Sequence, residues 1–153
     1  FFMKATSEQA TWARIMSALG GGNWNTWSPY IIKYKGRFGL YGSGNKPQID
    51  FSTDVCDGTW HHVAFSFQPN NDRPDPTNSI AKVYVDYGEP AVAQTQSIFK
   101  YPENLHFVLG GVGLSTDTGY FGLIDEFRIS DRALTPDQFL RAEPAPGFTI
   151  LVR

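Results

Sequence analysis

Residues 57–68 of the chain are Asp-Gly-Thr-Trp-His-His-Val-Ala-Phe-Ser-Phe-Gln. The Asp-Gly pair is a strong turn signal, and the residues after it alternate between apolar and more polar side chains. Because successive side chains of a strand point to opposite faces, His61 shares one face with Val63 while His62 faces the other way. This stretch therefore predicts a half-buried strand over 61–68 that begins after a tight turn.

Short runs of the same kind recur between turn signals along the chain. We expect strands over 12–19, 30–34, 37–41, 48–52, 61–68, 80–86, 105–109 and 121–130. Their number and spacing are typical of an all-β, two-sheet antiparallel sandwich. One short helix is predicted near the C-terminus, because Thr135 is a good N-cap, Pro136 suits the first helical position and Gln138 completes a capping box. This helix should end near Ala142.

The composition fits one folded domain over residues 1–153. Hydrophobic residues make up 41%, charged residues 18% and aromatic residues 15%, which excludes a coiled coil or a disordered tail. The net charge of −2 gives no reason to expect nucleic acid as a partner, and no apolar run reaches the roughly 20 residues that span a bilayer. The chain begins Phe-Phe-Met-Lys, with neither an initiator methionine nor a signal peptide, so we expect a fragment or module of a larger protein.

The histidines and the single cysteine offer little chemistry. His61 and His62 point to opposite faces and cannot chelate one ion, so we expect His61 to be a core histidine bonded to backbone. His62 and His106 either contribute to a polar face or are solvated. With one cysteine, Cys56, no intramolecular disulfide or multi-cysteine zinc site can form, and no cation flanks the thiol, so it should be inert.

The predicted strand over 121–130 places an acid in an unusual position. Alternation puts Asp125 on the same face as Phe121, Leu123, Phe127 and Ile129, which we expect to face the core. A carboxylate among apolar neighbours must accept hydrogen bonds, pair with a cation or bind a metal. Asp125 therefore either accepts backbone N–H bonds or pairs with an arginine, or it is a calcium (Ca2+) ligand.

The segment over 20–27 is the best candidate for a ligand site. Tryptophan in a polar, glycine-rich loop exposes apolar area unless it packs back on the fold or meets a ligand. Sugar rings present apolar C–H faces to aromatic rings, and asparagine amides both donate to and accept from hydroxyls. The predicted ligand-binding residues are Trp24, Trp27, Asn23 and Asn25, with Tyr30 a further residue on a strand face. The alternative is that either indole folds over the end of the sandwich and plugs the core.

Four motifs occur in order along the chain: Asp-Gly-Thr-Trp-His-His-Val-Ala at 57–64, Val-Tyr-Val-Asp at 83–86, Gly-Leu-Ile-Asp-Glu-Phe-Arg-Ile at 122–129 and Arg-Ala-Leu-Thr at 132–135. Together they resemble the laminin-G-like jelly roll of the concanavalin A-like lectin/glucanase superfamily over nearly the whole chain. The resemblance implies two antiparallel sheets, one curved into a shallow concave face. It also implies that residues 1–4 match the middle of an early strand, so the opening strand, which usually packs beside the last one, is missing or supplied differently. Tyr87 stands where the family usually has Gly after Asp86.

The resemblance implies a non-catalytic module that binds a glycan or polysaccharide, in a secreted, periplasmic or cell-surface protein. Other domains of the parent chain are further expected partners, and relatives often hold calcium through an Asp at the position of Asp125. The alternative from another class is a structural or adhesive module that makes protein contacts.

A glycoside hydrolase is the third possibility. The hydrolases of this superfamily carry their carboxylates in a Glu-x-Asp-x-x-Glu pattern, and no glutamate of this chain has an aspartate two residues on. Asp125 and Glu126 are adjacent and point to opposite faces of a strand. We therefore expect no enzymatic activity in this domain, whether or not it is attached to an enzyme.

Overall fold

The computed structural model describes residues 1–9, 13–20, 28–32, 37–41, 48–49, 53–68, 79–95, 105–111, 119–141 and 149–152. The strands in these residues are β1 (Phe2–Ala5), β2 (Ala13–Arg14), β3 (Met16–Gly20), β4 (Ser28–Ile32), β5 (Arg37–Tyr41), β6 (Gln48–Ile49), β7 (Trp60–Gln68), β8 (Ser79–Val85), β9 (Ala91–Thr95), β10 (Leu105–Leu109), β11 (Gly122–Asp125) and β12 (Thr149–Val152). A short 3-10 turn, η1, covers Pro136–Gln138.

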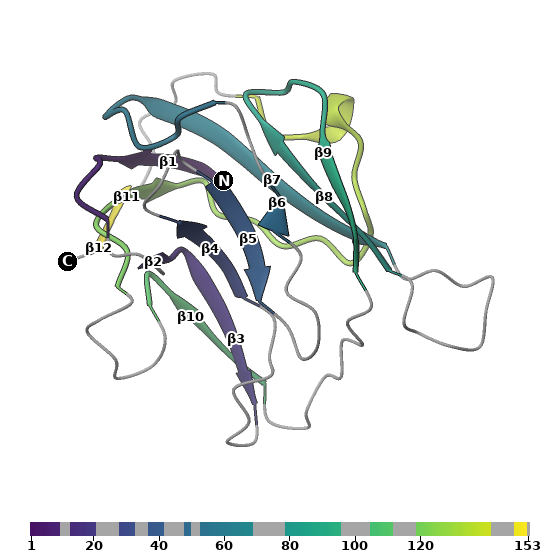
Figure 1. The fold of residues 1–153 in the computed structure, drawn as a ribbon, viewed down its shortest axis with the longest axis horizontal. Helices are drawn as coiled ribbons and strands as arrows, with labels where there is room; N and C mark the ends of the chain where they lie inside the picture. Colours follow the sequence, from purple (N-terminus) through teal and green to yellow (C-terminus); the bar gives the residue numbers. More distant parts are fainter. Residues whose placement is uncertain are drawn as a thin grey trace.

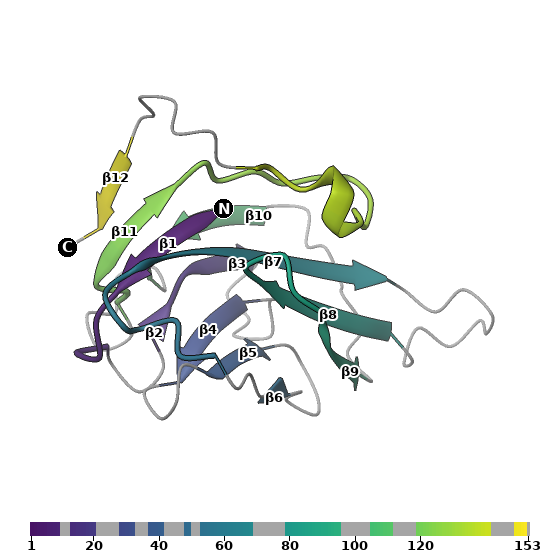
Figure 2. The same ribbon diagram turned by 90° about the horizontal axis from the view of Figure 1, so that it is seen from above.

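The strands form an antiparallel sandwich, as expected for the fold class. One sheet has six strands in the order β12-β11-β1-β7-β8-β9, a second has four in the order β2-β4-β5-β6, and β10 pairs with β3. Figure 1 shows the six-stranded sheet wrapping over β4 and β5, and Figure 2 shows the two layers from above. The prediction of an all-β, two-sheet jelly-roll sandwich is confirmed.

The core lies against the inner face of the six-stranded sheet. Every second residue of β1 is buried, so Met3 and Ala5 point inward while Phe2 and Lys4 point outward. The core cluster consists of Met3, Ala5, Ile15, Val55, Cys56, Val63, Ala81, Val83, Val85, Tyr120 and Ile124. The outward residues of this sheet form what we call the outer face.

Most predicted strands are present with shifted ends. The predicted strand over 37–41 coincides with β5, and the one over 61–68 is β7 with Trp60 added. The predicted strand over 12–19 is divided into β2 and β3 at Ile15, whose side chain is fully buried. The early strand that the resemblance implied at residues 1–4 is present as β1, whereas β9 and β12 were not predicted. Strand β11 pairs with β1 on one side and with β12 on the other. β12 is therefore the second neighbour of β11, which the sequence had left undetermined.

The short helix predicted from Thr135 is present only as the three-residue 3-10 turn η1, so it ends earlier than expected. The capping box expected at the start of the helix is formed: Gln138 Oε1 accepts a hydrogen bond from the Thr135 N–H at 3.1 Å. The chain then leaves helical geometry at Phe139, whose backbone is extended (φ −69°, ψ 153°). The Phe139 ring packs against the outer face of the sheet, and this tertiary contact ends the helix.

The strand predicted over 121–130 is also wrong in length and in orientation. Strand β11 ends at Asp125, because Glu126 adopts a left-handed backbone conformation (φ 49°). The inward residue is Ile124, which is fully buried, whereas Phe121 is 50% exposed and Ile129 is 61% exposed. The apolar residues of this segment favoured a register one residue away from the observed one. A shift of one residue turns every side chain of a strand to the other face of the sheet.

Candidate functional site

Most of the predicted ligand-binding residues cannot be placed. Trp24, Trp27, Asn23 and Asn25 lie outside the described residues. Tyr30 is in β4, opposite Gly39 of β5, and its side chain lies outside the described part. The proposal that these residues bind a sugar therefore stays a prediction.

Asp125 is the last residue of β11 and lies on the outer face, not among core-facing neighbours. It is opposite Phe2 of β1 and Thr149 of β12. Its Oδ1 accepts a hydrogen bond from the Glu126 N–H at 2.8 Å, so the first of the two predicted alternatives is present. Among the residues that the structure describes, no three His, Cys, Asp or Glu side chains form a group that could hold a metal ion. Calcium takes six to eight oxygen ligands, and Asp125 by itself would supply one carboxylate toward them.

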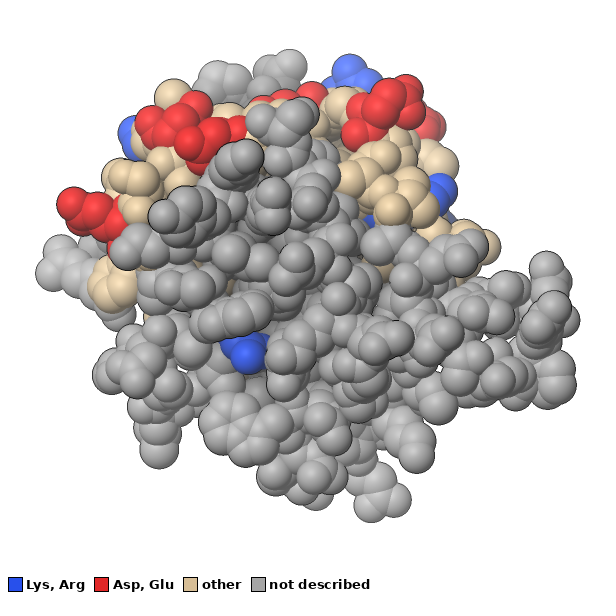
Figure 3. All heavy atoms as spheres, in the orientation of Figure 1, with Lys and Arg blue, Asp and Glu red and all other residues tan. Residues whose placement is uncertain are grey.

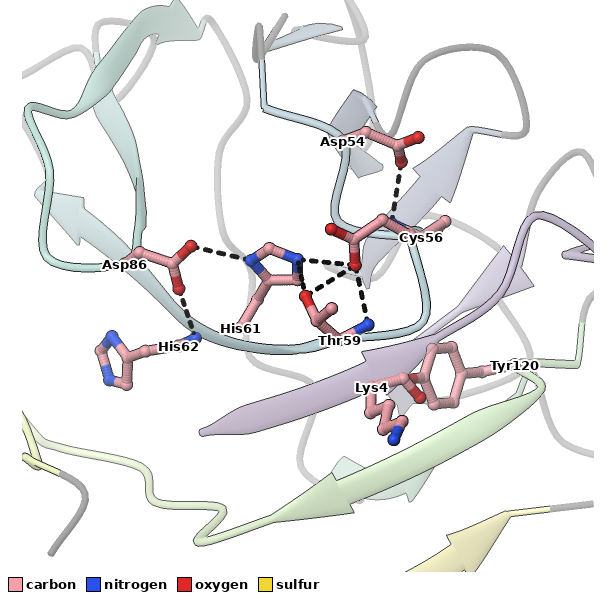
Figure 4. A network of polar contacts seen from close by, with 9 residues as sticks. Lys4, Asp54, Cys56, Thr59, His61, His62, Asp86 and Tyr120 are labelled. Atoms are coloured by element: carbon pink, nitrogen blue, oxygen red, sulfur yellow. Dashed lines mark hydrogen bonds and ion pairs between the residues drawn. The ribbon is translucent and has the colours of Figure 1, made fainter.

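The densest polar cluster is at the start of β7, where the Asp57-Gly58 turn enters the sheet (Figure 4). Gly58 adopts φ 85°, which only glycine does at little cost. The Asp57 carboxylate accepts hydrogen bonds at 2.7 Å from both the N–H and the hydroxyl of Thr59, which fixes the turn. This turn aims the Asp57 carboxylate at the imidazole of His61.

His61 lies between two carboxylates. Its Nδ1 is 2.7 Å from Asp86 Oδ2, and its Nε2 is 3.1 Å from Asp57 Oδ1. Burial lowers the pKa of His61, but the hydrogen bonds and charges of Asp86 and Asp57 outweigh it and raise the pKa overall. The pKa of Asp57 falls to about 2, chiefly because of the Thr59 N–H and hydroxyl and then of His61. The arrangement therefore stabilises an imidazolium ion.

The expectation that His61 bonds to backbone is wrong, because its partners are these two side chains. The sequence contained one usable signal: Asp57 lies four residues before His61 across a turn. Asp86 lies 25 residues away, and only the pairing of β7 with β8 brings it to the imidazole.

His62 lies on the outer face and is buried, so the expectation of a polar or solvated face is wrong for this residue. Its ring stacks on Tyr87 at 4.4 Å between centroids and 5° between planes, and Phe2 and Phe139 close the sides at 5.1 and 5.6 Å. Its Nδ1 is buried without a hydrogen-bond partner in the described part of the chain. Burial, and secondarily the amino group of Phe1, lowers the pKa of His62 to about 4, against a smaller opposing effect of Asp86. His106 is in β10, and its side chain lies outside the described part.

The hairpin between β8 and β9 contacts both His61 and His62. Asp86 and Tyr87 both have positive φ angles (49° and 62°), and Val85 O accepts the Gly88 N–H at 2.9 Å. Asp86 Oδ1 also accepts the backbone N–H of His62 at 2.9 Å, so one carboxylate contacts both histidines. A bulky residue with positive φ is strained, and the strain at Tyr87 is offset by its stack on His62 and by the hydrogen bond of its hydroxyl to Leu140 O at 2.6 Å.

Trp60 is a surface residue that sequence reasoning did not select. It lies two residues before His62 and therefore shares the outer face, yet it is 43% exposed. It is opposite Lys4, which is opposite Leu123, so the three form one row across β7, β1 and β11. The available signal was the alternation itself, which puts Trp60 on the face away from Val63.

Cys56 has the environment of an inert thiol. It is buried at the edge of the core, and its backbone N–H donates to Asp54 Oδ1 at 2.9 Å. Burial, with the charges of Asp54 and Asp57, raises the pKa of the thiol to about 11. Because the thiolate is the nucleophilic form, a thiol with this raised pKa is held in its unreactive protonated form at neutral pH.

The comparisons with known proteins agree with the geometry of the fold. A laminin G-like family model, described as the concanavalin A-like lectin/glucanases superfamily, matches residues 1–139. No curated protein and no solved structure matches the chain significantly. Within the described ranges, no helix has the length and apolar character needed to cross a membrane.

Proposed function

The chain belongs to the concanavalin A-like lectin/glucanases superfamily, and from this we propose that it is a non-catalytic module that binds a glycan or polysaccharide. The observation that carries the proposal is the exposed indole of Trp60 on the outer face. Burying an indole gains free energy in proportion to the apolar area covered, and the C–H face of a sugar ring is a suitable cover.

The position of Trp60 supports a ligand in preference to a packing role. Toward β8 the outer face is covered, and His62 and Tyr84 are buried beneath residues 131–141. Toward β11 the row of Trp60, Lys4 and Leu123 continues the same face, and Lys4 and Leu123 are half-buried. Lys4 is opposite Trp60 in the register of β1 and β7, and an ammonium group at this position is a donor for sugar hydroxyls.

A neutral glycan fits the charge of the surface better than a polyanion does. Figure 3 shows the side of the molecule that carries β4 and β5, where the described acidic side chains lie along the upper rim and the described basic ones are scattered. On the outer face, the row of Trp60, Lys4 and Leu123 contains one cation. A polyanion needs clustered lysine and arginine, whereas a neutral sugar needs an aromatic ring and a few polar groups. Trp24, Trp27, Asn23, Asn25 and Tyr30 remain the proposed second part of this sugar-binding surface.

We propose binding without catalysis because the carboxylates of the polar cluster are unsuited to acid catalysis. A retaining glycosidase needs one carboxyl group that stays protonated and a second about 5–5.5 Å away. Asp57 has a pKa of about 2 and is ionised at neutral pH, and Asp86 shares the same imidazole. Both acids act as acceptors for His61.

The proposed setting is a secreted, periplasmic or cell-surface protein, in which other domains of the parent chain are further partners. The support for this setting is the laminin G-like family. Calcium binding through Asp125 also remains a proposal, with the further oxygens coming from outside the described residues.

A glycan and polysaccharide panel in 2 mM calcium tests the proposal, followed by titration calorimetry on any hit. We expect Trp60→Ala to raise the Kd about tenfold or more, equivalent to roughly 1.4 kcal/mol. Val92→Ala is the matched control, because Val92 is also exposed on a strand of the same sheet (57%) but lies on β9 at its far edge. Trp24→Ala and Trp27→Ala test the segment over 20–27 separately. If only these two variants weaken sugar binding, the binding site lies in that segment and not on the outer face.

Silence across the panel would contradict glycan binding and favour the alternative, a structural or adhesive module. One observation supports that alternative: Phe121, the residue directly before β11, is 50% exposed. An aromatic side chain of this kind is also typical of protein contacts.

A further inference from the structure

Residues 131–141, which we call the strap, cross the outer face of the six-stranded sheet after β11. Figures 1 and 2 show the strap running from β11 over β7 and placing η1 beside β8. Its attachment is aromatic: the Phe139 ring lies 5.0 Å from Tyr84 and 5.6 Å from His62, centroid to centroid. Leu140 O accepts the Tyr87 hydroxyl at 2.6 Å, and the Arg141 guanidinium lies 5.9 Å from the centre of the Tyr87 ring.

The strap has little structure beyond these contacts. None of its residues is fully buried, and its regular structure is the single turn of η1. Segments with few buried contacts open at a lower free energy than the core to which they attach. The strap therefore meets the structural requirement for opening while the sandwich stays folded.

The group beneath the strap is one that resists a proton in the closed state. His62 is enclosed by Phe2 from β1, Tyr87 from the hairpin and Phe139 from the strap, and its Nδ1 meets no acceptor in the described part of the chain. A proton added there would give a buried N–H without a partner. The faces of aromatic rings attract a cation, whereas burial of the His62 ring lowers its pKa to about 4.

The charged groups around His62 do not offset this cost. From β1, the amino group of Phe1 disfavours a second positive charge, and from the strap, Arg141 lies over the Tyr87 ring. From the hairpin, the Asp86 carboxylate favours the charge, but it already accepts hydrogen bonds from His61 Nδ1 and from the His62 backbone N–H. β8 contributes the Tyr84 ring, which contacts Phe139.

We propose that the strap is an acid-released latch, which protonation of His62 detaches from the outer face through the contacts of Phe139 and Tyr87. Release would uncover Phe2, His62, Tyr84 and Tyr87 and extend the exposed face that begins at Trp60. The proposal rests on the contacts of the strap and on the surroundings of His62, and it is independent of whether the face binds a glycan.

The direction of the pH dependence follows from the two states of His62. Its pKa is about 4 when the strap is closed and returns toward 6.5 when it is open, so the closed state loses stability as pH falls from 6.5 toward 4. With these limits, the ratio of open to closed strap at pH 5 rises at most roughly 30-fold over its value at pH 8. His61 is stabilised as an imidazolium in this range, so the cluster on the other face stays intact.

The test is a single fluorine label, 4-fluorophenylalanine at position 139, followed by fluorine NMR between pH 8 and pH 4.5. We expect a packed resonance at pH 8 and growth of a solvent-exposed one below pH 6.5, while near-ultraviolet circular dichroism shows a folded sandwich. His62→Phe should abolish the pH response, because it keeps an aromatic ring and removes the proton site. Asp137→Asn is the matched control: Asp137 is a titrating group on the strap itself, and its loss should leave the response unchanged.

Three results would overturn the latch. One is a pH response that survives His62→Phe or disappears in Asp137→Asn. Another is simultaneous loss of the packed resonance and of the folded sandwich, which would show that the strap is not a separate unit. If His62→Phe does not fold, carbon–proton NMR of the His62 ring in the unmutated chain decides, since titration near 6.5 with the strap closed would contradict the proposal.

Discussion

His61 and His62 are neighbours on β7 with opposite electrostatic environments. His61 faces inward, where two carboxylates contact its nitrogens and raise its pKa. His62 faces outward, where three aromatic rings surround it and its pKa falls to about 4. Both are buried, so burial alone does not decide the protonation of a histidine. The decisive factor is whether an acceptor faces each nitrogen.

The largest expected effect is the loss of the carboxylate that the two sides share. Asp86→Ala removes the acceptor of His61 Nδ1 and of the His62 N–H, and we expect a loss of about 2–3 kcal/mol in the free energy of unfolding. Urea unfolding at pH 6 measures it. Glu89→Ala, at an exposed residue beside the same hairpin, should change stability by less than about 0.5 kcal/mol. Equal losses in the two variants would show that Asp86 is a solvated loop residue.

The pH dependence of stability separates the two histidines. The contribution of His61 is complete below pH 6.5 and is lost as pH rises through its raised pKa in the folded state. The contribution of His62 is complete above pH 6.5 and is lost as pH falls toward 4, by about 2 kcal/mol after allowance for partial solvation. Unfolding free energies of His61→Gln and His62→Phe, measured from pH 4 to pH 9, should each flatten one side of the profile. A profile in which both variants flatten the same side would contradict the comparison.

How far the sequence could predict these two environments depends on the distance of the partners. Alternation around Val63 correctly separated the two histidines onto opposite faces, because the period of a strand is a local property. The pairing of His61 with Asp86 was not predictable, because it requires the register of β7 on β8. The burial of His62 was not predictable either, since it depends on a strap 69 to 79 residues further along the chain.

The errors in the fold have the same origin. The capping box at Thr135 is a local signal and was correct, but Phe139 ends the helix by packing on residues far away in sequence. In β11, Gly122 points inward, where the Tyr120 hydroxyl lies 2.6 Å from the place of a Cβ, so the apolar pattern favoured the wrong face. β9, with the sequence Ala-Val-Ala-Gln-Thr, has few strong strand formers, and its pairing with β8 supplies what its composition lacks.

Calcium at Asp125 would place a cation on the outer face, where burial already lowers the pKa of His62. Asp125 and His62 are both opposite Phe2, one on each side of β1. For a weak site with a Kd near ~0.1 mM, about 2 mM calcium would add roughly 1.8 kcal/mol, or roughly 4–7 °C in Tm. Thermal melts in calcium and in EDTA test this, with Asp125→Asn as the variant that should lose the shift. A shift below about 1 °C would refute the calcium proposal.

The smallest expected effect concerns a single hydroxyl group. Tyr87→Phe keeps the ring on His62 and removes the hydrogen bond to Leu140 O, which should cost about 1 kcal/mol of unfolding free energy. Tyr87→Gly relieves the positive φ but loses both ring and hydroxyl, so it should be less stable than Tyr87→Phe. Urea unfolding at pH 7.5 ranks the three chains. If the glycine variant were the most stable, strain at Tyr87 would outweigh its contacts, and the outer face would be held by Phe139 alone. If Tyr87→Phe is more stable than Tyr87→Gly, the contacts of the Tyr87 ring outweigh the strain of its positive φ, and Tyr87 holds the strap at this hairpin.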